Sequence, residues 1–135
     1  MLFFAGKITL KIYRNEVNMQ LNTIDQVFIT RTLKLSHPLS TDVTIAIGKP
    51  KKFTDSQDYY CSFQITGLGD EKVNWAGGID EVQALLLALE QIGIRLSETE
   101  EYKQGHLSWI GSDERNLGFP HSDSAGMLTR FLPKS

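Results

Sequence analysis

Residues 80–97 read DEVQALLLALEQIGIRLS, and this stretch decides the fold. Asp80 is a good N-cap residue, and Glu81 adds a favourable negative charge in the first turn of the helix. Apolar side chains then recur at helical spacing, within about 120° of one another at about 100° per residue. The members of this stripe are Val82, Leu85, Leu86, Leu89, Ile92 and Leu96. The pattern predicts one long amphipathic helix whose stripe faces a β-sheet.

Two apolar residues of this predicted helix lie outside the stripe. Leu87 and Ile94 are seven positions apart and share the far side with Gln83, Glu90 and Gln91. Two interpretations remain open. Either the C-terminal segment covers them, since Met127, Leu128, Phe131 and Leu132 recur there at helical spacing, or they contact a partner or a second copy of the chain.

Segments before and after the helix alternate apolar and polar residues, which is the period of a β-strand. Residues 26–35, 42–48 and 59–66 precede the helix, a shorter strand is predicted at 72–76, and a last one follows at 105–111. Short connections favour antiparallel pairing, because a parallel crossover needs about a dozen residues. The order predicts an α+β fold in which an antiparallel sheet of four to five strands is covered on one face by a single long helix.

The length of 135 residues fits one domain, which we expect to span residues 19–135. Two interpretations of residues 1–18 remain open. They are an extension before a biological start at Met19, or they contain an extra strand, since Ile8, Leu10 and Ile12 alternate with Lys7, Thr9 and Lys11.

Residue types that carry chemistry are present without the spacing that a catalytic or metal site needs. Cys61 alternates with polar neighbours in a predicted strand and is expected in the core. His37, His106 and His121 are scattered, whereas structural zinc ligands are usually close pairs. The glycine pairs at 67/69 and 77/78 lack the further residues of a nucleotide-binding loop and are expected in turns. The sequence therefore predicts no catalytic residue, no cofactor and no metal.

Charge and hydropathy limit the classes of partner and the location that we expect for this chain. Lys49, Lys51 and Lys52 stand near Phe53 in a predicted polar loop at 49–58, but a net charge of −2 does not favour nucleic acid. No apolar stretch approaches the roughly 20 residues that cross a bilayer, so no membrane is expected. A single cysteine excludes a disulfide within the chain, and the N-terminal apolar run is too short for a signal peptide. We therefore expect a cytoplasmic protein.

Several short motifs resemble a known group of proteins. They are IGKP at 47–50, YCSFQI at 60–65, GLG at 67–69, AGGID at 76–80 with QAL at 83–85, and LGFP at 117–120. The pattern resembles small bacterial proteins that share a domain of unknown function, and it covers roughly residues 26–120. The resemblance implies a bacterial cytoplasmic α+β domain. It implies no activity, cofactor or catalytic residue.

We expect a non-enzymatic protein-binding module, with an immunity-like or regulatory role as its concrete form. Acidic residues such as Glu98 would steer association with a cationic partner. The candidate partner-binding residues are Leu87, Ile94, Glu100, Glu101, Trp109, Asp113 and Glu114. The alternative is a small-molecule-binding domain or small enzyme, using a cleft between the sheet and the C-terminal tail with Trp75, Trp109 and Asp113. A further alternative is a homodimer formed through Leu87 and Ile94 or through an exposed sheet edge.

Overall fold

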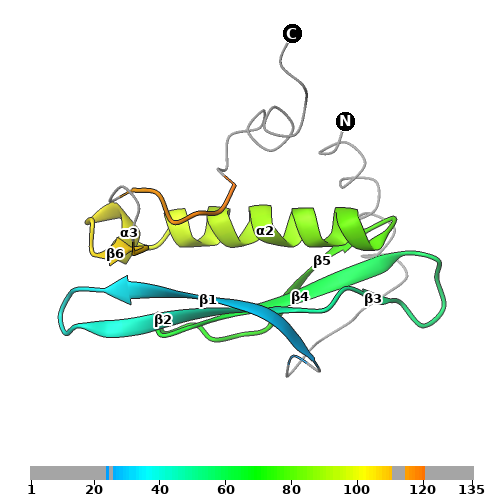
Figure 1. Ribbon diagram of the computed structural model, residues 1–135, viewed down its shortest axis with the longest axis horizontal. Helices are drawn as coiled ribbons and strands as arrows, with labels where there is room; N and C mark the ends of the chain where they lie inside the picture. The colour runs from blue at the N-terminus through cyan, green and yellow to red at the C-terminus, as the bar shows by residue number, and fades with distance from the viewer. Residues whose placement is uncertain (1–23, 25, 111–114, 121–135) are drawn as a thin grey trace, which may run out of the picture.

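The computed structural model describes residues 24, 26–110 and 115–120. Within them, an antiparallel sheet is covered on one face by the long helix α2 (Figure 1). The predicted α+β class is therefore confirmed. In chain order the elements are β1 (Val27–Leu35), β2 (Thr41–Gly48), β3 (Lys51–Lys52), β4 (Tyr59–Thr66), β5 (Asn74–Gly78), α2 (Glu81–Ser97), α3 (Glu100–Lys103) and β6 (Leu107–Ser108).

Six strands form the sheet in the order β3-β4-β2-β1-β6, and β5 pairs with β4. Two of them are two-residue strands that sequence reasoning misjudged. β3 lies within the predicted loop at 49–58, because Lys51 and Lys52 pair with Tyr60 and Tyr59. β6 is far shorter than the predicted strand at 105–111, since its pairing with β1 covers two residue pairs.

Alternation along the strands separates a buried face from a polar face. Leu33, Val43, Ile45 and Phe63 point toward α2 and are at most 1% exposed. On the opposite face, Thr32 lies beside Thr44 and Thr44 beside Thr66, which gives a row of threonines across three strands. The helix therefore covers the apolar face, as the period of two in the sequence requires.

The helix begins as predicted. Asp80 is the N-cap, and its carboxylate accepts a hydrogen bond of 2.8 Å from the backbone N–H of Gln83. The side-chain oxygen of Gln83 in turn accepts from the N–H of Ile79 at 2.8 Å. The N–H of Gln83 is one of the backbone donors that a helix leaves without an internal partner, and the bond from Ile79 ties the preceding residue to the first turn. These two bonds fix the start of α2.

The buried face of α2 differs from the predicted stripe. Ala84, Ala88, Ile92 and Leu96 are fully buried, whereas Val82 is 65% exposed. Leu85 and Leu89 pack against the core in part, and Leu86 is half-buried. The physical reason for this difference is that the backbones of β5 and α2 lie close together. A Cβ built on Gly78 of β5 would lie 2.4 Å from the backbone nitrogen of Ala84. Small alanines therefore occupy the part of the contact nearest β5, and Ile92 and Leu96 fill the rest of the buried face.

Glycines outside the helix have two different roles. Gly67 and Gly69 have φ angles of +113° and +103°, which confirms the predicted turn between β4 and β5. Gly77 and Gly78, also predicted in a turn, instead pair with Tyr60 and Tyr59 as the end of β5. The missing side chain at Gly78 is needed for the approach of α2 rather than for a turn.

The described end of the chain, residues 115–120, crosses α2 as a strap (Figure 1). At the crossing, a Cβ built on Gly93 would lie 2.2 Å from the carbonyl oxygen of Pro120 and 3.3 Å from Cβ of Phe119. Leu117 and Phe119 are buried and belong to the core cluster. The strap therefore closes the core on the side of α2 that faces β1.

Candidate binding surface

The edge of β1 is the most accessible pairing surface among the described residues. β1 pairs with β2 along its length, but on its other side β6 pairs with Lys34 and Leu35 alone among them. The register with β2 also shifts between Val27 and Ile29. A regular open edge remains at residues 29–33, and we call residues 27–33 the β1 edge.

The register shows which backbone groups of this edge point outward. The N–H of Ser36 donates to the carbonyl of His106 at 2.9 Å, toward β6. In an antiparallel strand the N–H and C=O of one residue point to the same side, and the side alternates along the chain. Thr32 and Thr30 therefore present their N–H and C=O groups to the open edge, while Arg31 and Leu33 bond to β2.

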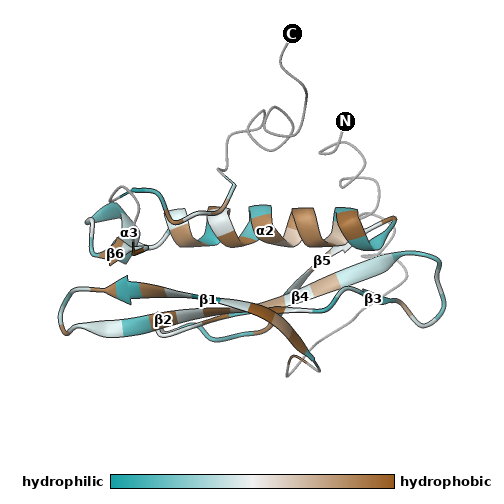
Figure 2. Ribbon diagram, in the orientation of Figure 1, coloured by the Kyte–Doolittle hydropathy of each residue, from teal (hydrophilic) through white to brown (hydrophobic). Residues whose placement is uncertain are grey.

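Exposed apolar side chains begin the same edge. Val27, Phe28 and Ile29 are 51%, 56% and 44% exposed. Figure 2 shows this hydrophobic start of β1 curving away from α2. Three consecutive exposed apolar residues beside unpaired backbone groups are unusual on a strand edge, which natural proteins commonly protect with charge, proline or a covering segment.

The other strand borders carry such protection. β3 consists of Lys51 and Lys52, and lysine opposes pairing with a further chain. β5 packs against α2, and its residues Ala76, Gly77 and Gly78 are buried. At the far end of β1, Lys34 and Asp42 form an ion pair of 2.6 Å. The β1 edge thus differs from the remaining borders in chemistry as well as in exposure.

Arg31, in the middle of this edge, directs its charge to the strap instead of to solvent. Its guanidinium lies 4.0 Å from the ring centroid of Trp109 and 4.8 Å from that of Phe119. Nη1 donates to the carbonyl oxygens of Leu117 and Gly118 at 3.2 and 2.7 Å. Burial lowers the pKa of Arg31, although an arginine remains charged at any ordinary pH. Arg31, the cation of the β1 edge, therefore has its charge satisfied on the helix side of the sheet.

The structure places the predicted partner-binding residues in separate regions. Leu87 packs partly against the core cluster, and Ile94 is half-buried. Adjacent helix residues are about 100° apart, so Ile94 does not share the face of Gly93, where the described strap crosses. Asp113 and Glu114, together with residues 1–18 and the apolar residues at 127–132, lie outside the described part of the chain.

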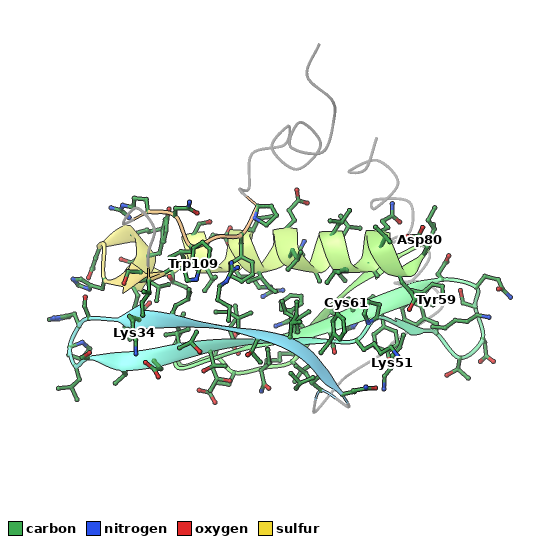
Figure 3. The ribbon with its side chains drawn as sticks, viewed as in Figure 1. Lys34, Lys51, Tyr59, Cys61, Asp80 and Trp109 are labelled. Carbon is green, nitrogen blue, oxygen red and sulfur yellow. The ribbon has the colours of Figure 1, made fainter. Side chains whose placement is uncertain are left out.

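Trp109 and Trp75, the aromatic residues of the predicted cleft, lie far from each other in the sheet order. Trp109 follows β6 and lies next to β1 (Figure 3). Trp75 belongs to β5, which pairs with β4, and its ring lies 5.6 Å from that of Phe53. The structure therefore does not bring these two tryptophans into one site.

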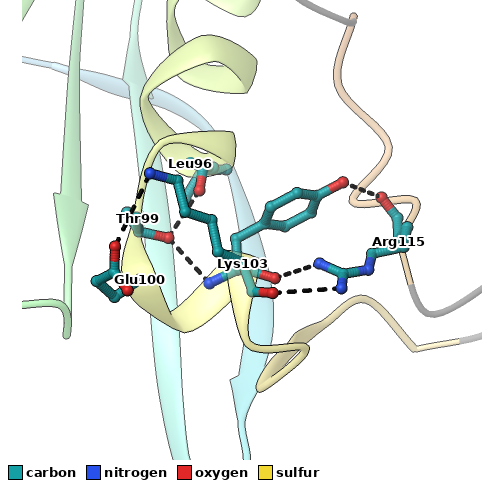
Figure 4. Close-up of polar contacts among 6 residues, drawn as sticks. Leu96, Thr99, Glu100, Lys103 and Arg115 are labelled. Atoms are coloured by element: carbon teal, nitrogen blue, oxygen red, sulfur yellow. Dashed lines mark hydrogen bonds and ion pairs between the residues drawn. The ribbon is translucent and has the colours of Figure 1, made fainter.

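Glu100 and Glu101 lie on α3, where they form an acidic corner with Glu98. Thr99 caps α3 by accepting from the N–H of Tyr102 at 3.1 Å, and Lys103 lies 3.8 Å from Glu100 (Figure 4). Arg115 of the strap donates to the backbone carbonyls of Tyr102 and Lys103. This corner is held by local bonds, and part of its acidic charge is offset by two basic residues.

Cys61 is a core residue, as predicted. It is fully buried between the sheet and α2 (Figure 3), and its thiol donates to the carbonyl of Gly48 at 3.4 Å. Burial raises the pKa of the thiol to about 12. A thiol held in its neutral form is a poor nucleophile, so the environment of Cys61 does not suit covalent catalysis.

Two of the three histidines meet in space, which sequence spacing did not predict. The rings of His37 and His106 lie 4.7 Å apart between centroids, because the segments after β1 and before β6 are joined by the Ser36–His106 backbone bond. Among the described residues, no group of three or more His, Cys, Asp or Glu side chains could hold a metal ion.

A small polar hollow lies between the β4–β5 connection and the end of α2. Its volume is about 200 Å³. The lining residues are Ile65, Leu68, Asp70, Lys72, Asn74, Arg95, Glu98 and Thr99. Two acidic and two basic side chains meet there, and a volume of this size is below the usual range of about 300–1,000 Å³ for small-molecule sites.

The described residues thus define a small α+β protein with an open sheet edge, and none of their helices is long and apolar enough to cross a membrane. A family model, Domain of unknown function (DUF6968), matches residues 29–121, and the chain belongs to this family. The expected resemblance to a domain of unknown function is therefore confirmed. A search of curated proteins found no match, and neither did a search of solved structures.

Proposed function

We propose that this chain is a non-enzymatic protein-binding module of the bacterial cytoplasm that binds its partner through the β1 edge. The observation that carries the proposal is the coincidence of exposed Val27, Phe28 and Ile29 with the outward-facing backbone groups of Thr30 and Thr32. Addition of a strand to a sheet edge derives affinity from main-chain hydrogen bonds and specificity from side-chain contacts.

The surroundings of the edge support binding rather than catalysis. Its apolar side chains offer contact area, while no titratable group at residues 27–30 could move a proton. A regulatory or immunity-like role, in which the module occupies another protein, fits this surface. The acidic corner on α3 would help to steer a cationic partner during association.

The experiment is affinity purification of the tagged full chain from its own host, followed by mass spectrometry and quantification of each bound protein. Phe28→Lys removes an exposed apolar contact and adds a charge at the edge. Leu39→Lys is the matched control, since Leu39 is 72% exposed and lies in the turn between β1 and β2. We expect a stoichiometric partner that Phe28→Lys reduces at least about tenfold and Leu39→Lys leaves bound.

Equal loss with both variants, or equal retention with both, would contradict binding through the β1 edge. A partner lost instead on charge reversal of Glu100 and Glu101 would move the binding surface to the acidic corner. Both results depend on variants that fold, which circular dichroism and thermal unfolding establish before the purification.

A second candidate function is binding of a small zwitterion in the hollow near the end of α2. The observation that favours it is the opposed pair of charges, Asp70 and Glu98 against Lys72 and Arg95. Thermal-shift screening of amino acids and related zwitterions tests it. A stabilising compound whose effect is lost in Arg95→Gln and retained in Arg31→Gln would support this function over protein binding.

A further inference from the structure

We infer that the partner which fits the β1 edge is a second copy of this chain, joined by antiparallel β1–β1 pairing about a two-fold axis. This inference rests on the proposed function, because it names the occupant of the same surface. A two-fold axis makes both copies use the same residues, so the surface must be complementary to itself. The β1 edge meets that condition in charge, in backbone groups and in length.

Charge is the first condition. Residues 26–30 carry no charged side chain. Arg31, the one cation within the β1 edge, is bound to the strap through Leu117 and Gly118, under the rings of Trp109 and Phe119. Like charges directly opposite each other would destabilise an antiparallel pair. Two copies of this edge therefore meet without facing free cations, whereas two copies of β3 would oppose Lys51 and Lys52.

Backbone groups are the second condition. Thr30 and Thr32 both present an N–H donor and a C=O acceptor outward. In an antiparallel pair centred near Thr30, the Thr30 residues of the two copies exchange two backbone hydrogen bonds. The same centre places Phe28 of one copy opposite Thr32 of the other. Exposed apolar side chains then gain cross-strand neighbours, which stabilise a sheet.

Length is the third condition, and it also limits affinity. β6 occupies the edge at Lys34 and Leu35, and the register shift disturbs it near Phe28. Pairing is thus restricted to about five residues of each copy. An interface built on so short a ladder is small, so we expect a weak, concentration-dependent dimer rather than an obligate one.

The first test measures the mass of the full chain in solution by sedimentation and light scattering, from about 1 µM to about 1 mM, the range of weak association. We expect the mass to rise from 15.2 kDa toward twice that value. Ile29→Lys should raise the dissociation constant at least about tenfold, because the antiparallel register centred on Thr30 places this cation directly opposite Arg31 of the other copy. Ile79→Lys is the matched control, since Ile79 is 60% exposed and lies before α2.

A second measurement locates the interface independently of stability. Thr30→Cys is treated with a short bismaleimide, and Thr66→Cys, exposed at the end of β4, serves as the control. The native thiol of Cys61 is buried and does not compete. We expect covalent dimers with Thr30→Cys and far fewer with Thr66→Cys. Crosslinking through Thr66→Cys alone would overturn β1–β1 pairing.

The outcomes separate this inference from the proposed function. A chain that stays monomeric to about 1 mM overturns the inference, and if Phe28→Lys still releases a different protein partner, the proposed function survives. A dimer that Ile29→Lys leaves intact also overturns the inference. If the chain stays monomeric and a protein partner responds equally to Phe28→Lys and Leu39→Lys, both the inference and the proposed function are overturned.

Discussion

At the scale of single residues, Arg31 links the strap to β1. One side chain reaches from β1 to two carbonyl oxygens and two aromatic rings of residues that are 78 to 88 positions away. Gly118 permits this contact, because its φ is +79° and a Cβ there would lie 2.4 Å from Nη1 of Arg31. The LGFP motif at 117–120 thus has a structural reason, independent of any chemical activity.

We predict that Arg31→Met lowers the free energy of unfolding by about 1–3 kcal/mol. The variant keeps an aliphatic stem but loses the charged hydrogen bonds and the cation–π contacts. Lys34→Met is the control on the same strand, and we expect a loss below about 1 kcal/mol because its ion pair with Asp42 is exposed. Urea unfolding followed by circular dichroism measures both. Equal losses would show that the strap contacts contribute little.

Cys61 gives a prediction about pH. Burial raises the folded-state pKa to about 12 from an ordinary value of 9.0, so the folded chain holds the thiol proton at a pH where the unfolded chain releases it. The contribution of Cys61 is present below pH 9 and is lost as pH rises from there toward 12. At pH 10 this loss is on the order of 1 kcal/mol relative to pH 7.

The measurement compares the wild type with Cys61→Ala in chemical unfolding at pH 7 and pH 10. Other titrating groups affect both proteins and cancel in the difference. We expect the stability advantage of the wild type to shrink by on the order of 1 kcal/mol between the two pH values. An advantage that is constant or grows with pH would show that the thiol ionises as readily in the folded chain as in the unfolded chain.

At the scale of secondary-structure elements, α2 illustrates what a sequence reveals and what it conceals. Its bounds were predictable, because Asp80 caps one end and the apolar periodicity ends with Leu96. Its rotation was not, because the hydrophobic pattern gives weight to large side chains such as Val82. Close approach to β5 favours small residues instead, and Ala84 and Ala88 carry little hydrophobic signal of their own.

The same distinction applies to the strands and to the candidate surface. β1, β2 and β4 were visible in the period of two, since each has one buried face. The two-residue strands β3 and β6 depend on neighbours and leave no periodic signal. The exposure of Val27, Phe28 and Ile29 also could not be predicted from the sequence. Their apolar character predicts burial, and whether a strand is an edge is a property of the assembled sheet.

We predict that Ala88→Leu lowers the free energy of unfolding by about 1–3 kcal/mol, because the added carbons have no space between α2 and the sheet. Val82→Leu on the exposed side of the same helix should change it by no more than about 0.5 kcal/mol. Thermal and urea unfolding test the pair. A larger loss for Val82→Leu than for Ala88→Leu would mean that Val82 belongs to the buried face of α2, as the sequence pattern predicts.

At the scale of the whole molecule, the fold protects all but one of the sheet borders that the described residues form. α2 and the strap cover the apolar face, lysines occupy β3, and β5 packs beneath the helix. The β1 edge combines apolar side chains with outward backbone groups, and its central cation is bound internally. An edge with these properties implies an occupant, and its self-complementarity favours a second copy of the chain.

Amide hydrogen exchange by NMR reads the state of this edge directly. In a dilute sample we expect the amides of Thr30 and Thr32 to exchange fast, since they point away from β2, and those of Arg31 and Leu33 to be protected. When about nine-tenths of the chains are paired, exchange at Thr30 should slow about tenfold, because only the free tenth exposes that amide. Arg31 and Leu33 should keep their rates at both concentrations. Protection of Thr30 that is already full in the dilute sample would mean that another segment of the same chain occupies the edge, and the β1–β1 dimer would then have no pairing surface.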